Sequence, residues 1–433
     1  MERPFTNALW YLTLSRDEFA SDAVLDRAIT HGSGCYLYDR SGKRYLDARS
    51  GLWNVTLGYG NERVVRAMAD EVARLPGGQI VRYDQPTEIA LEYAERLVSL
   101  LPDHLEHVRL LTTGAQATEG AIFLSRFVRK AHGEPERTEV LAFRQGYHGT
   151  GGLATHLSDE PWMHEAEGPL APGVHRVEHW DLDALREAIE RVGPERLTAF
   201  ICEPILGTDV LPAPPGYFEA AQELCAEHGI HVVLDEITTG FGRTGALAET
   251  VRLGLRPDML LLSKGITSGY APLSAIATTR AILDQALDAD VVFPHGATAD
   301  GNSVSVAAAT AVLDELEDGS VFRNAVERGE ELRERLNDLR DELPLIWDVR
   351  GRGLITGVEL RDGEGEPLPP ETMTALRIAA RDAGLLFSPS NTTVIFTPPL
   401  VISSEECEQI VSLLAGCLRP IADQGRVPLA TRR

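Results

Sequence analysis

Residues 259–265 read Met-Leu-Leu-Leu-Ser-Lys-Gly, a short apolar run that ends in a lysine. Because the run is apolar throughout rather than alternating, it predicts a strand that is buried on both faces of a sheet. Lysine is rarely buried without a partner, so Lys264 at the end of such a strand is a candidate functional residue. Desolvation disfavours the ammonium form of an amine, which suits Schiff-base chemistry at this position.

Similar apolar runs lie on both sides of this one in the sequence, with turn or helix patterns between them. They are Val108–Thr112, Glu139–Phe143, Leu197–Cys202, His231–Leu234 and Ala275–Thr278. Strands that alternate with helices predict an α/β fold in which a mostly parallel central sheet is covered by helices. We assign this sheet to a large domain over residues 61–320.

The two ends of the chain fall outside this alternation. After about residue 320 the pattern predicts helices and strands at Leu332–Leu339, Ile346–Val349, Leu354–Leu360, Glu371–Ala383 and Ser403–Leu418. A chain of 433 residues is long for a single core, so two lobes are expected. We therefore expect a smaller α+β domain that residues 1–60 and 321–433 build together.

Composition and charge exclude several classes of protein. The formal net charge is −24, from 65 acidic residues against 41 Lys plus Arg, so a nucleic acid or an anionic membrane would be repelled. The N-terminus has no signal-peptide pattern, and no run approaches the roughly 18 apolar residues of a membrane helix. The five cysteines are odd in number and have no metal-like spacing, which is typical of a reduced, cytoplasmic protein without a metal site.

The stretch Leu-Thr-Thr-Gly-Ala-Gln-Ala at 111–117 marks the junction between a strand and a helix. Gly114 and Ala115 leave room for a phosphate to approach the first free N–H groups of the helix, where the helix dipole also favours an anion. Most junctions of this kind are plain tight turns, and this alternative stays open on the stretch alone.

A carboxylate, Asp235, directly follows another apolar strand, at the end where open α/β sheets bind ligands. A helix-capping aspartate is the plainer alternative. The loop that follows, Thr-Gly-Phe-Gly-Arg-Thr-Gly at 239–245, has three glycines and must be irregular and closely packed. Core packing does not demand such a loop, so the stretch indicates a functional site.

Taken together, these segments resemble the class III aminotransferases, which are pyridoxal-phosphate (PLP) enzymes of fold type I. The likeness is carried by SGLWNVTLGYG (50–60), DEITTGFGRTG (235–245), SKGITSGYAPLSA (263–275), HGATADGN (295–302) and VRGRGLITGVEL (349–360). It extends over almost the whole chain and is closest to the amine:pyruvate, or ω-aminotransferase, branch. The resemblance implies a ping-pong transfer of an amino group between an amine and a carbonyl compound.

Several residue roles follow from the resemblance. Lys264 would form a Schiff base with PLP and shuttle a proton between the substrate carbon and the cofactor. Asp235 would keep the pyridine nitrogen protonated, so that the ring accepts electrons. Gly114 and Ala115 would bind the phosphate, together with Thr298 from the neighbouring subunit of a homodimer.

The resemblance also places residues around the pyridine ring. Tyr147 would stack on one face and Ile237 on the other, while His148 would support the ring. Glu203 would lie near the ring substituents, although a strand-end turn is the plainer explanation of any single Glu-Pro pair. Arg243 is a candidate to bind a substrate carboxylate, and its loop is equally suited to structural hydrogen bonds.

The sequence departs from the family near the C-terminus. Members that act on α-amino acids usually carry an arginine shortly before a PPL element, to pair with the α-carboxylate. Residues 386–400 contain neither Arg nor Lys, and the two arginine positions used in the family correspond to Ile395 and Ser388. We expect an amino group to move between a primary or terminal amine, or an amino acid, and a keto acid, aldehyde or ketone. Since Trp53 would line the pocket, a donor whose reacting carbon bears no carboxylate is favoured.

Two other functions fit parts of this pattern. An aminomutase or a decarboxylase on the same scaffold would keep the cofactor, but a mutase needs no separate amino acceptor and a decarboxylase releases carbon dioxide. A cofactor-binding transcriptional sensor would need a DNA-reading module, and the acidic chain shows no helix-turn-helix extension.

Overall fold

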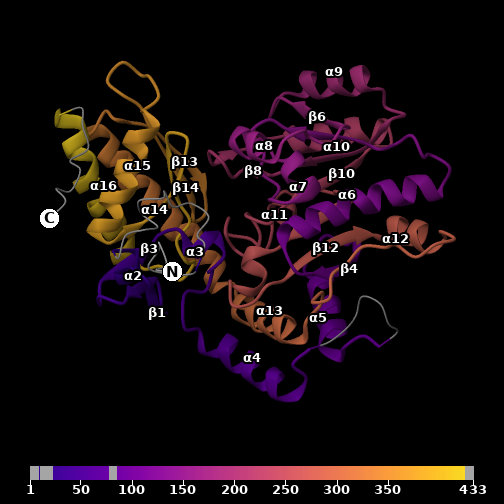
Figure 1. Ribbon diagram of the computed structural model, residues 1–433, viewed down its shortest axis with the longest axis horizontal. Helices are drawn as coiled ribbons and strands as arrows, with labels where there is room; N and C mark the ends of the chain where they lie inside the picture. The colour runs from indigo at the N-terminus through magenta and orange to yellow at the C-terminus, as the bar shows by residue number, and fades with distance from the viewer. Residues whose placement is uncertain (1–8, 10–22, 78–84, 425–433) are drawn as a thin grey trace, which may run out of the picture.

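The computed structural model describes residues 9, 23–77 and 85–424. Two lobes lie side by side (Figure 1), and the larger is built on a seven-stranded sheet. Its strands are β4 (Leu105–Leu111), β5 (Glu139–Phe143), β6 (Val174–Val177), β7 (Leu197–Cys202), β10 (His231–Asp235), β11 (Met259–Leu262) and β12 (Ser274–Thr279). In space their order is β4-β12-β11-β10-β7-β5-β6.

The expected α/β fold with a mostly parallel sheet is confirmed, with one exception. Strands β6, β5, β7, β10 and β11 pair in parallel, whereas β12 runs antiparallel to both β11 and β4. Only residues 263–273 connect β11 to β12, and they form the short 3-10 helix η1 (Lys264–Thr267) and turns. A parallel connection needs a crossover of about a dozen residues or more, usually a helix, so this link returns antiparallel.

Helices cover both faces of the sheet. One face packs on α5 (Glu88–Ser99), α9 (Leu182–Val192), α10 (Tyr217–Glu227) and α13 (Ser303–Leu316). The other packs on α6 (Gly114–Ala131), α7 (Gly152–Leu157) and α12 (Arg280–Leu287). Neighbouring residues of β11 belong to different clusters, Leu260 to the first and Leu261 to the second, which explains why the strand is apolar throughout.

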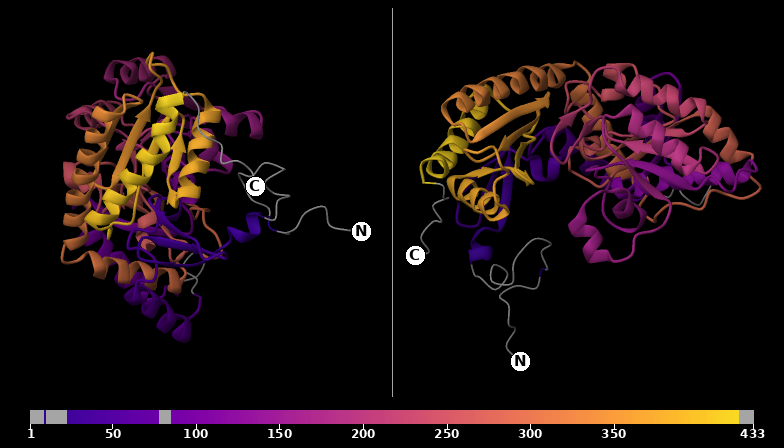
Figure 2. Two further views of the ribbon diagram at one scale, coloured as in Figure 1. Left: turned by 90° about the vertical axis from the view of Figure 1, so that its left-hand side faces the viewer. Right: turned by 90° about the horizontal axis from the view of Figure 1, so that it is seen from above.

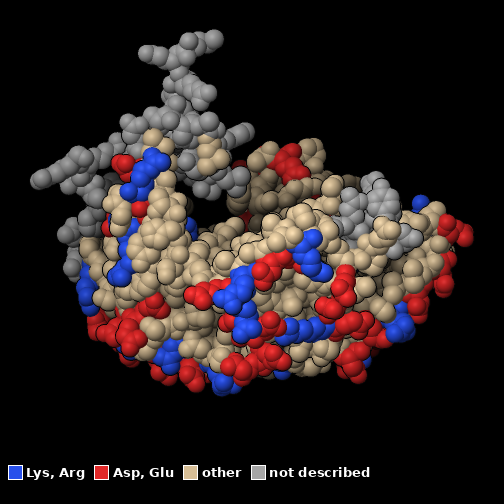
Figure 3. Space-filling view, turned by 90° about the horizontal axis from the view of Figure 1, so that it is seen from below, with Lys and Arg blue, Asp and Glu red and all other residues tan. Residues whose placement is uncertain are grey.

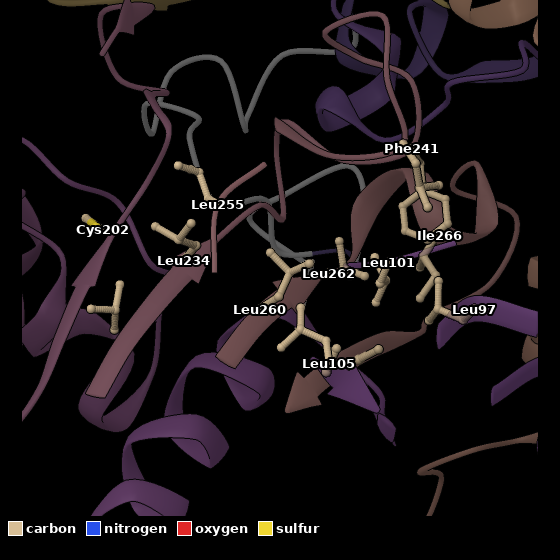
Figure 4. Packing of buried hydrophobic residues seen from close by; sticks show 14 of the residues in the cluster. Leu97, Leu101, Leu105, Cys202, Leu234, Phe241, Leu255, Leu260, Leu262 and Ile266 are labelled. Carbon is tan, nitrogen blue, oxygen red and sulfur yellow. The ribbon is translucent and has the colours of Figure 1, made fainter. Parts of the chain in front are cut away.

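The side chains packed around β11, the strand that precedes Lys264, fix the position of that strand (Figure 4). Leu260 lies beside Leu262 and near Leu105 of β4, and Ile266 from η1 lies beside Phe241 of the glycine-rich loop. All five side chains are buried. A fully packed interior resists displacement, so the end of β11 is held rigidly where the lysine follows it.

The remaining elements of the large lobe connect these layers or flank them. They are α4 (Glu62–Arg74), α8 (Pro161–Glu167), α11 (Glu249–Leu253), β8 (Ile205–Leu206) and β9 (Leu211–Pro212). Helix α4 packs on α13 at the base of the lobe in Figure 1. Seen from below, acidic and basic side chains are intermixed on the surface (Figure 3). The basic groups on this face are therefore interrupted by acidic ones, which a polyanion would not favour.

The smaller lobe combines segments from the two halves of the chain. From the first sixty residues come α2 (Ala23–Asp26), β1 (Ile29–Ser33), β2 (Tyr36–Asp39), β3 (Arg44–Asp47) and α3 (Ser50–Trp53). The later elements are α14 (Ser320–Glu342), β13 (Ile346–Arg352), β14 (Ile355–Leu360), α15 (Pro370–Ala383), β15 (Leu385–Leu386), β16 (Ser388–Ser390), β17 (Thr393–Phe396) and α16 (Ser404–Gln424).

Strand β15 joins the two sets of segments, because it pairs in parallel with β3 through Leu385 and Leu46. The yellow helix α16 lies against the orange α14 in both views of Figure 2. One buried cluster contains Cys35 and Leu46 together with residues of α14 and α16. These contacts support our division into 61–320 and a second domain of 1–60 plus 321–433, which we keep as a proposal; residues 1–22, except Leu9, and 425–433 lie outside the described residues.

Within the described residues, no helix combines the length and the apolar character that a membrane crossing requires. The five cysteines are free and buried.

Candidate active site

A cavity of about 190 Å³ opens at the carboxyl ends of β10 and β11, beside the start of α6. The two strands are parallel, so the residues that follow them emerge at the same edge of the sheet. The cavity is lined by Gly114, Ala115, Tyr147, His148, Gly149, Thr150, Asp235, Ile237, Thr238, Ser263 and Lys264. Seven of these residues are ones that the sequence singled out, so the fold brings them together.

Lys264 starts η1 with a backbone φ of +45°, a left-handed conformation that turns the chain sharply at the strand end. Its side chain keeps some exposure to the cavity, and its Nζ donates a hydrogen bond of 2.7 Å to Thr238 Oγ1. Burial lowers the pKa of Lys264 to about 8, although the nearby carboxylates of Asp235 and Glu203 oppose that shift. About a tenth of the amine is therefore neutral at pH 7, far more than for an ordinary lysine, and the neutral form is the one that a nucleophile or base requires.

Asp235 ends β10 and directs its carboxylate into the same cavity. Its Oδ1 accepts a hydrogen bond of 3.0 Å from the Ile237 amide, and its Oδ2 lies 2.8 Å from Nδ1 of the buried His148. No helix starts at Asp235, so the helix-capping alternative does not apply to it. His148 Nε2 is buried and has no hydrogen-bond partner among the described residues, which leaves a polar atom available to a bound group.

The start of α6 forms a cradle of small residues. Thr113 caps the helix by accepting a 3.2 Å hydrogen bond from the Gln116 amide, while the amides of the first turn have no acceptor within the helix. A Cβ atom on Gly114 would approach Ile237 Cδ1 to 3.0 Å. Gly149 has a φ of +116°, and a Cβ there would meet the Ala115 side chain at 2.8 Å. Larger residues would close this end of the cavity.

Glu203 is buried behind Tyr147, outside the residues that line the cavity. Its carboxylate accepts hydrogen bonds from the amides of Tyr147 (2.9 Å) and Gly207 (3.2 Å). Burial raises the pKa of Glu203 to about 7, and the charge of Asp235 adds to that shift. Tyr147 keeps 39% of its surface exposed, so its ring is free to cover a ligand.

The small lobe supplies the opposite side of the site. The Trp53 ring centroid lies 4.9 Å from Lys264 Nζ, and Trp53 Nε1 donates a 2.8 Å hydrogen bond to Ser388 Oγ. The ring also packs against a buried cluster of aliphatic side chains that includes Ile395. Ser388 therefore contacts Trp53 and Ile395 belongs to the cluster beside it, and neither position, for which the resemblance implied an arginine, carries a charge.

Arg243 is buried in the glycine-rich loop, with 1% of its surface exposed. Its Nη1 donates hydrogen bonds to the backbone oxygens of Leu354 (2.8 Å) and Pro398 (2.6 Å), and its Nη2 lies 3.5 Å from Ser50 Oγ. Burial lowers the pKa of Arg243 to about 9. These contacts tie the large lobe to the small one, so they favour the structural alternative over contact with a substrate carboxylate.

Thr298 is exposed and does not line the cavity of its own chain. The loop that carries it is fixed by Asp300, which accepts hydrogen bonds from the Ala297 amide (2.7 Å) and from Thr112 Oγ1 (2.8 Å). Thr112 lies just before α6, so Asp300 links this loop to the cradle of small residues.

Two residues beside the predicted ones did not emerge from the sequence. Thr238 Oγ1 accepts a hydrogen bond from the Lys264 amine. Glu236 is a buried carboxylate that accepts hydrogen bonds from the Glu249 and Thr250 amides and from Thr239 Oγ1. Glu236 thereby caps α11 and anchors the glycine-rich loop. Their adjacency to Asp235 and Ile237 was the only available signal, because hydroxyl and carboxylate side chains are common in turns.

Comparison with solved structures identifies the fold. An (S)-enantioselective omega-transaminase from Thermomicrobium roseum is 34% identical, with a TM-score of 0.87 over 91% of this chain and 92% of that one. An amine transaminase from an uncultivated Pseudomonas species, solved in its PLP-bound form, is 31% identical, with a TM-score of 0.88 over 95% and 98% of the two chains. The fold is that of the PLP-dependent transaminases.

Comparison of sequences identifies the family. The model of "Aminotransferase class-III" matches residues 19–418. A taurine–pyruvate aminotransferase from Rhodobacter capsulatus is 32% identical over 92% of this chain and 92% of its own. The chain belongs to the class III aminotransferases and is an enzyme with transaminase activity, which rules out the transcriptional sensor.

Proposed function

We propose that this enzyme moves an amino group by a ping-pong mechanism between a primary or terminal amine without a carboxylate on its reacting carbon and a keto acid, aldehyde or ketone. The observation that carries the proposal is the position of Lys264. Its amine, with a pKa lowered to about 8, shares one cavity with the carboxylate of Asp235 and the start of α6.

The cavity suits PLP at both of the charged ends of that cofactor. The cradle at Gly114 and Ala115 offers helix amides to a phosphate. The carboxylate of Asp235 would pair with the pyridine nitrogen, and the hydrogen bonds from His148 and the Ile237 amide would hold it in place. When bound, PLP supplies an aldehyde that takes up the amino group and a ring that withdraws electrons from the reacting carbon.

The side chains around the ring would orient it and exclude water. Tyr147 would cover one ring face and Ile237 the other, since both line the cavity. His148, whose Nε2 has no hydrogen-bond partner among the described residues, would lie beside the ring and hold Asp235 in place. Glu203 would lie near the ring substituents, buried outside the cavity lining. Lys264 Nζ would bind the cofactor and, once released, move a proton to and from the substrate carbon.

A second subunit would complete the phosphate site. Thr298 is exposed on its own chain, and we assign it to the phosphate of the partner in a homodimer. An apolar groove of about 570 Å³ lies near this loop, with Val291 and Val292 exposed by 66% and 89%. Such a surface is unfavourable in water, which supports its burial by another copy. We also infer a cytoplasmic location from the five free cysteines.

The substrate preference is inferred from the wall that faces Lys264. The Ser388 hydroxyl accepts a hydrogen bond from the Trp53 indole N–H, and Ile395 is fully buried in the cluster against which that ring packs. Neither side chain pairs with a carboxylate as a bidentate arginine does. An aromatic and aliphatic wall instead favours an apolar substituent on the amine.

The test is to mix the purified PLP-loaded protein with a panel of amines and α-amino acids and follow the cofactor absorbance. Primary or terminal amines should convert the cofactor to its amino form, and an added keto acid or aldehyde should restore the original spectrum. Conversion by α-amino acids alone would contradict the substrate class. Release of carbon dioxide, or turnover without an acceptor, would instead identify a decarboxylase or an aminomutase.

A further inference from the structure

The hydroxyl of Thr238 is the direct hydrogen-bond acceptor of Lys264 Nζ, at 2.7 Å, and it lines the cavity. We propose that Thr238 is a positioning residue, whose Oγ1 holds the Lys264 amine beside the reacting carbon whenever that amine is not joined to the cofactor. The inference rests on the proposed role of Lys264 and adds a residue to it.

The backbone around Thr238 is anchored on both sides. Before it, the Ile237 amide donates to Asp235 Oδ1 at 3.0 Å. After it, Thr239 Oγ1 donates to the buried Glu236 at 2.9 Å. The β-branched side chain of threonine has few χ1 conformations, so a fixed backbone also fixes the direction of its hydroxyl. Thr238 is therefore a rigid acceptor.

A lysine that carries out proton transfer needs such an acceptor. Its side chain is long and flexible, and once released from the cofactor it would otherwise sample many conformations. The charged groups that affect Lys264 are Asp235, Glu203 and Arg243. The two carboxylates already accept hydrogen bonds from backbone amides or from His148, and Arg243 has no acceptor atom in its side chain.

A neutral hydroxyl serves this purpose better than a carboxylate. A third negative charge at 2.7 Å would stabilise the ammonium form and raise the lysine pKa, leaving less neutral amine to act as a base. The threonine hydroxyl also fixes the position of the amine, but it raises the lysine pKa by less than a carboxylate would. Thr238 thus reconciles a defined amine position with a low pKa.

The first measurement uses the full-length protein after removal of its cofactor. The rate of Lys264 acylation by acetic anhydride, followed over pH by peptide mass analysis, gives the apparent pKa of that amine. In Thr238→Val the ammonium form loses its acceptor, so this pKa should fall by about one relative to the unaltered protein. Thr238→Ser keeps a hydroxyl and should restore the original value.

Thr244→Val is the matched control, because Thr244 Oγ1 is buried in the loop that follows Thr238 and has no hydrogen-bond partner among the described residues. It should leave the apparent pKa of Lys264 unchanged. An unchanged pKa in Thr238→Val, or an equal fall in Thr244→Val, would overturn the proposal. The measurement needs no cofactor, so its result is independent of whether Lys264 is the cofactor lysine.

The second measurement is the rate of the amine half-reaction in the PLP-loaded protein, using an amine with protium or deuterium on its reacting carbon. Thr238→Val should slow the half-reaction about tenfold with little change in KM and increase the isotope effect, because the lysine proton transfer becomes slower. Thr238→Ser should recover most of the rate. A rise in KM alone, with the maximal rate and isotope effect unchanged, would assign Thr238 to substrate binding and contradict the positioning role.

Discussion

The cofactor side and the substrate side of the cavity are built in different ways. On the cofactor side, Lys264 and Asp235 extend from neighbouring parallel strands of one lobe, and each has a polar partner within hydrogen-bond distance. On the substrate side, Trp53 and Ser388 are 335 positions apart in the sequence and meet in the other lobe. The comparison leads us to propose that the large lobe determines the type of reaction and the small lobe the substrate preference.

The largest effect should come from the cofactor side. Asp235→Asn keeps the shape of the side chain but removes the charge that we assign to the pyridine nitrogen, so kcat should fall on the order of 10²- to 10³-fold for every amine alike. Steady-state kinetics with two amines of different size check this prediction. Asp103→Asn, which neutralises an exposed carboxylate paired with Arg256, is the matched control. A loss confined to one amine would contradict the division of roles.

Arg243→Met, at the junction of the lobes, should cause a large loss of stability rather than a loss of catalysis. The backbone oxygens of Leu354 and Pro398 would lose their donor, so the free energy of unfolding should fall by about 2–3 kcal/mol. Denaturant unfolding measures the loss, and KM for a keto-acid acceptor tests the alternative. A strong rise in that KM at unchanged stability would restore Arg243 as a substrate residue.

A smaller effect should come from the substrate side. Trp53→Ala removes the aromatic wall near Lys264, and the ratio of kcat/KM for a bulky amine over a small one should rise about tenfold. Trp347→Ala, an exposed tryptophan that stacks with Arg361, provides a control that should leave the ratio unchanged. An unchanged ratio in the Trp53 variant would remove that residue from the pocket.

The smallest effect should follow Ser388→Ala, which leaves the Trp53 ring in place but deletes its hydrogen-bond acceptor. Since a single neutral hydrogen bond contributes about 1 kcal/mol, the same ratio should rise only a few-fold. Combining this change with Trp53→Ala should add nothing, because the serine would act through the ring. An additive effect would show that Ser388 contacts the substrate independently.

The sequence predicted the cofactor side more completely than the substrate side. Strands 139–143 and 197–202 are observed at their expected bounds, because each is a compact apolar run. Strand β6 was missed because His175 and Arg176 interrupt its apolar pattern. The direction of β12 was not apparent because apolar runs carry no information about strand polarity; only the short link after β11 does.

The site shows the same limit. The placement of Lys264 and Asp235 at strand ends beside one cavity was predictable, because a polar group after an apolar run is a local signal; their roles stay a proposal. The contact of Trp53 with Ser388 depends on how the two ends of the chain pack, which no local pattern encodes. The role of Thr298 depends on a second subunit and stays a proposal. Arg243 was ambiguous because a buried arginine and a ligand-binding one have the same sequence environment.

The most direct test of the account is to locate the lysine that carries the cofactor. The PLP-loaded protein would be treated with borohydride to make the bond between cofactor and lysine irreversible, and then digested for peptide mass analysis. We expect the cofactor mass on the peptide that contains Lys264, and its loss in Lys264→Ala. A modified peptide from any other part of the chain, or no stable adduct with PLP, would contradict the central claim.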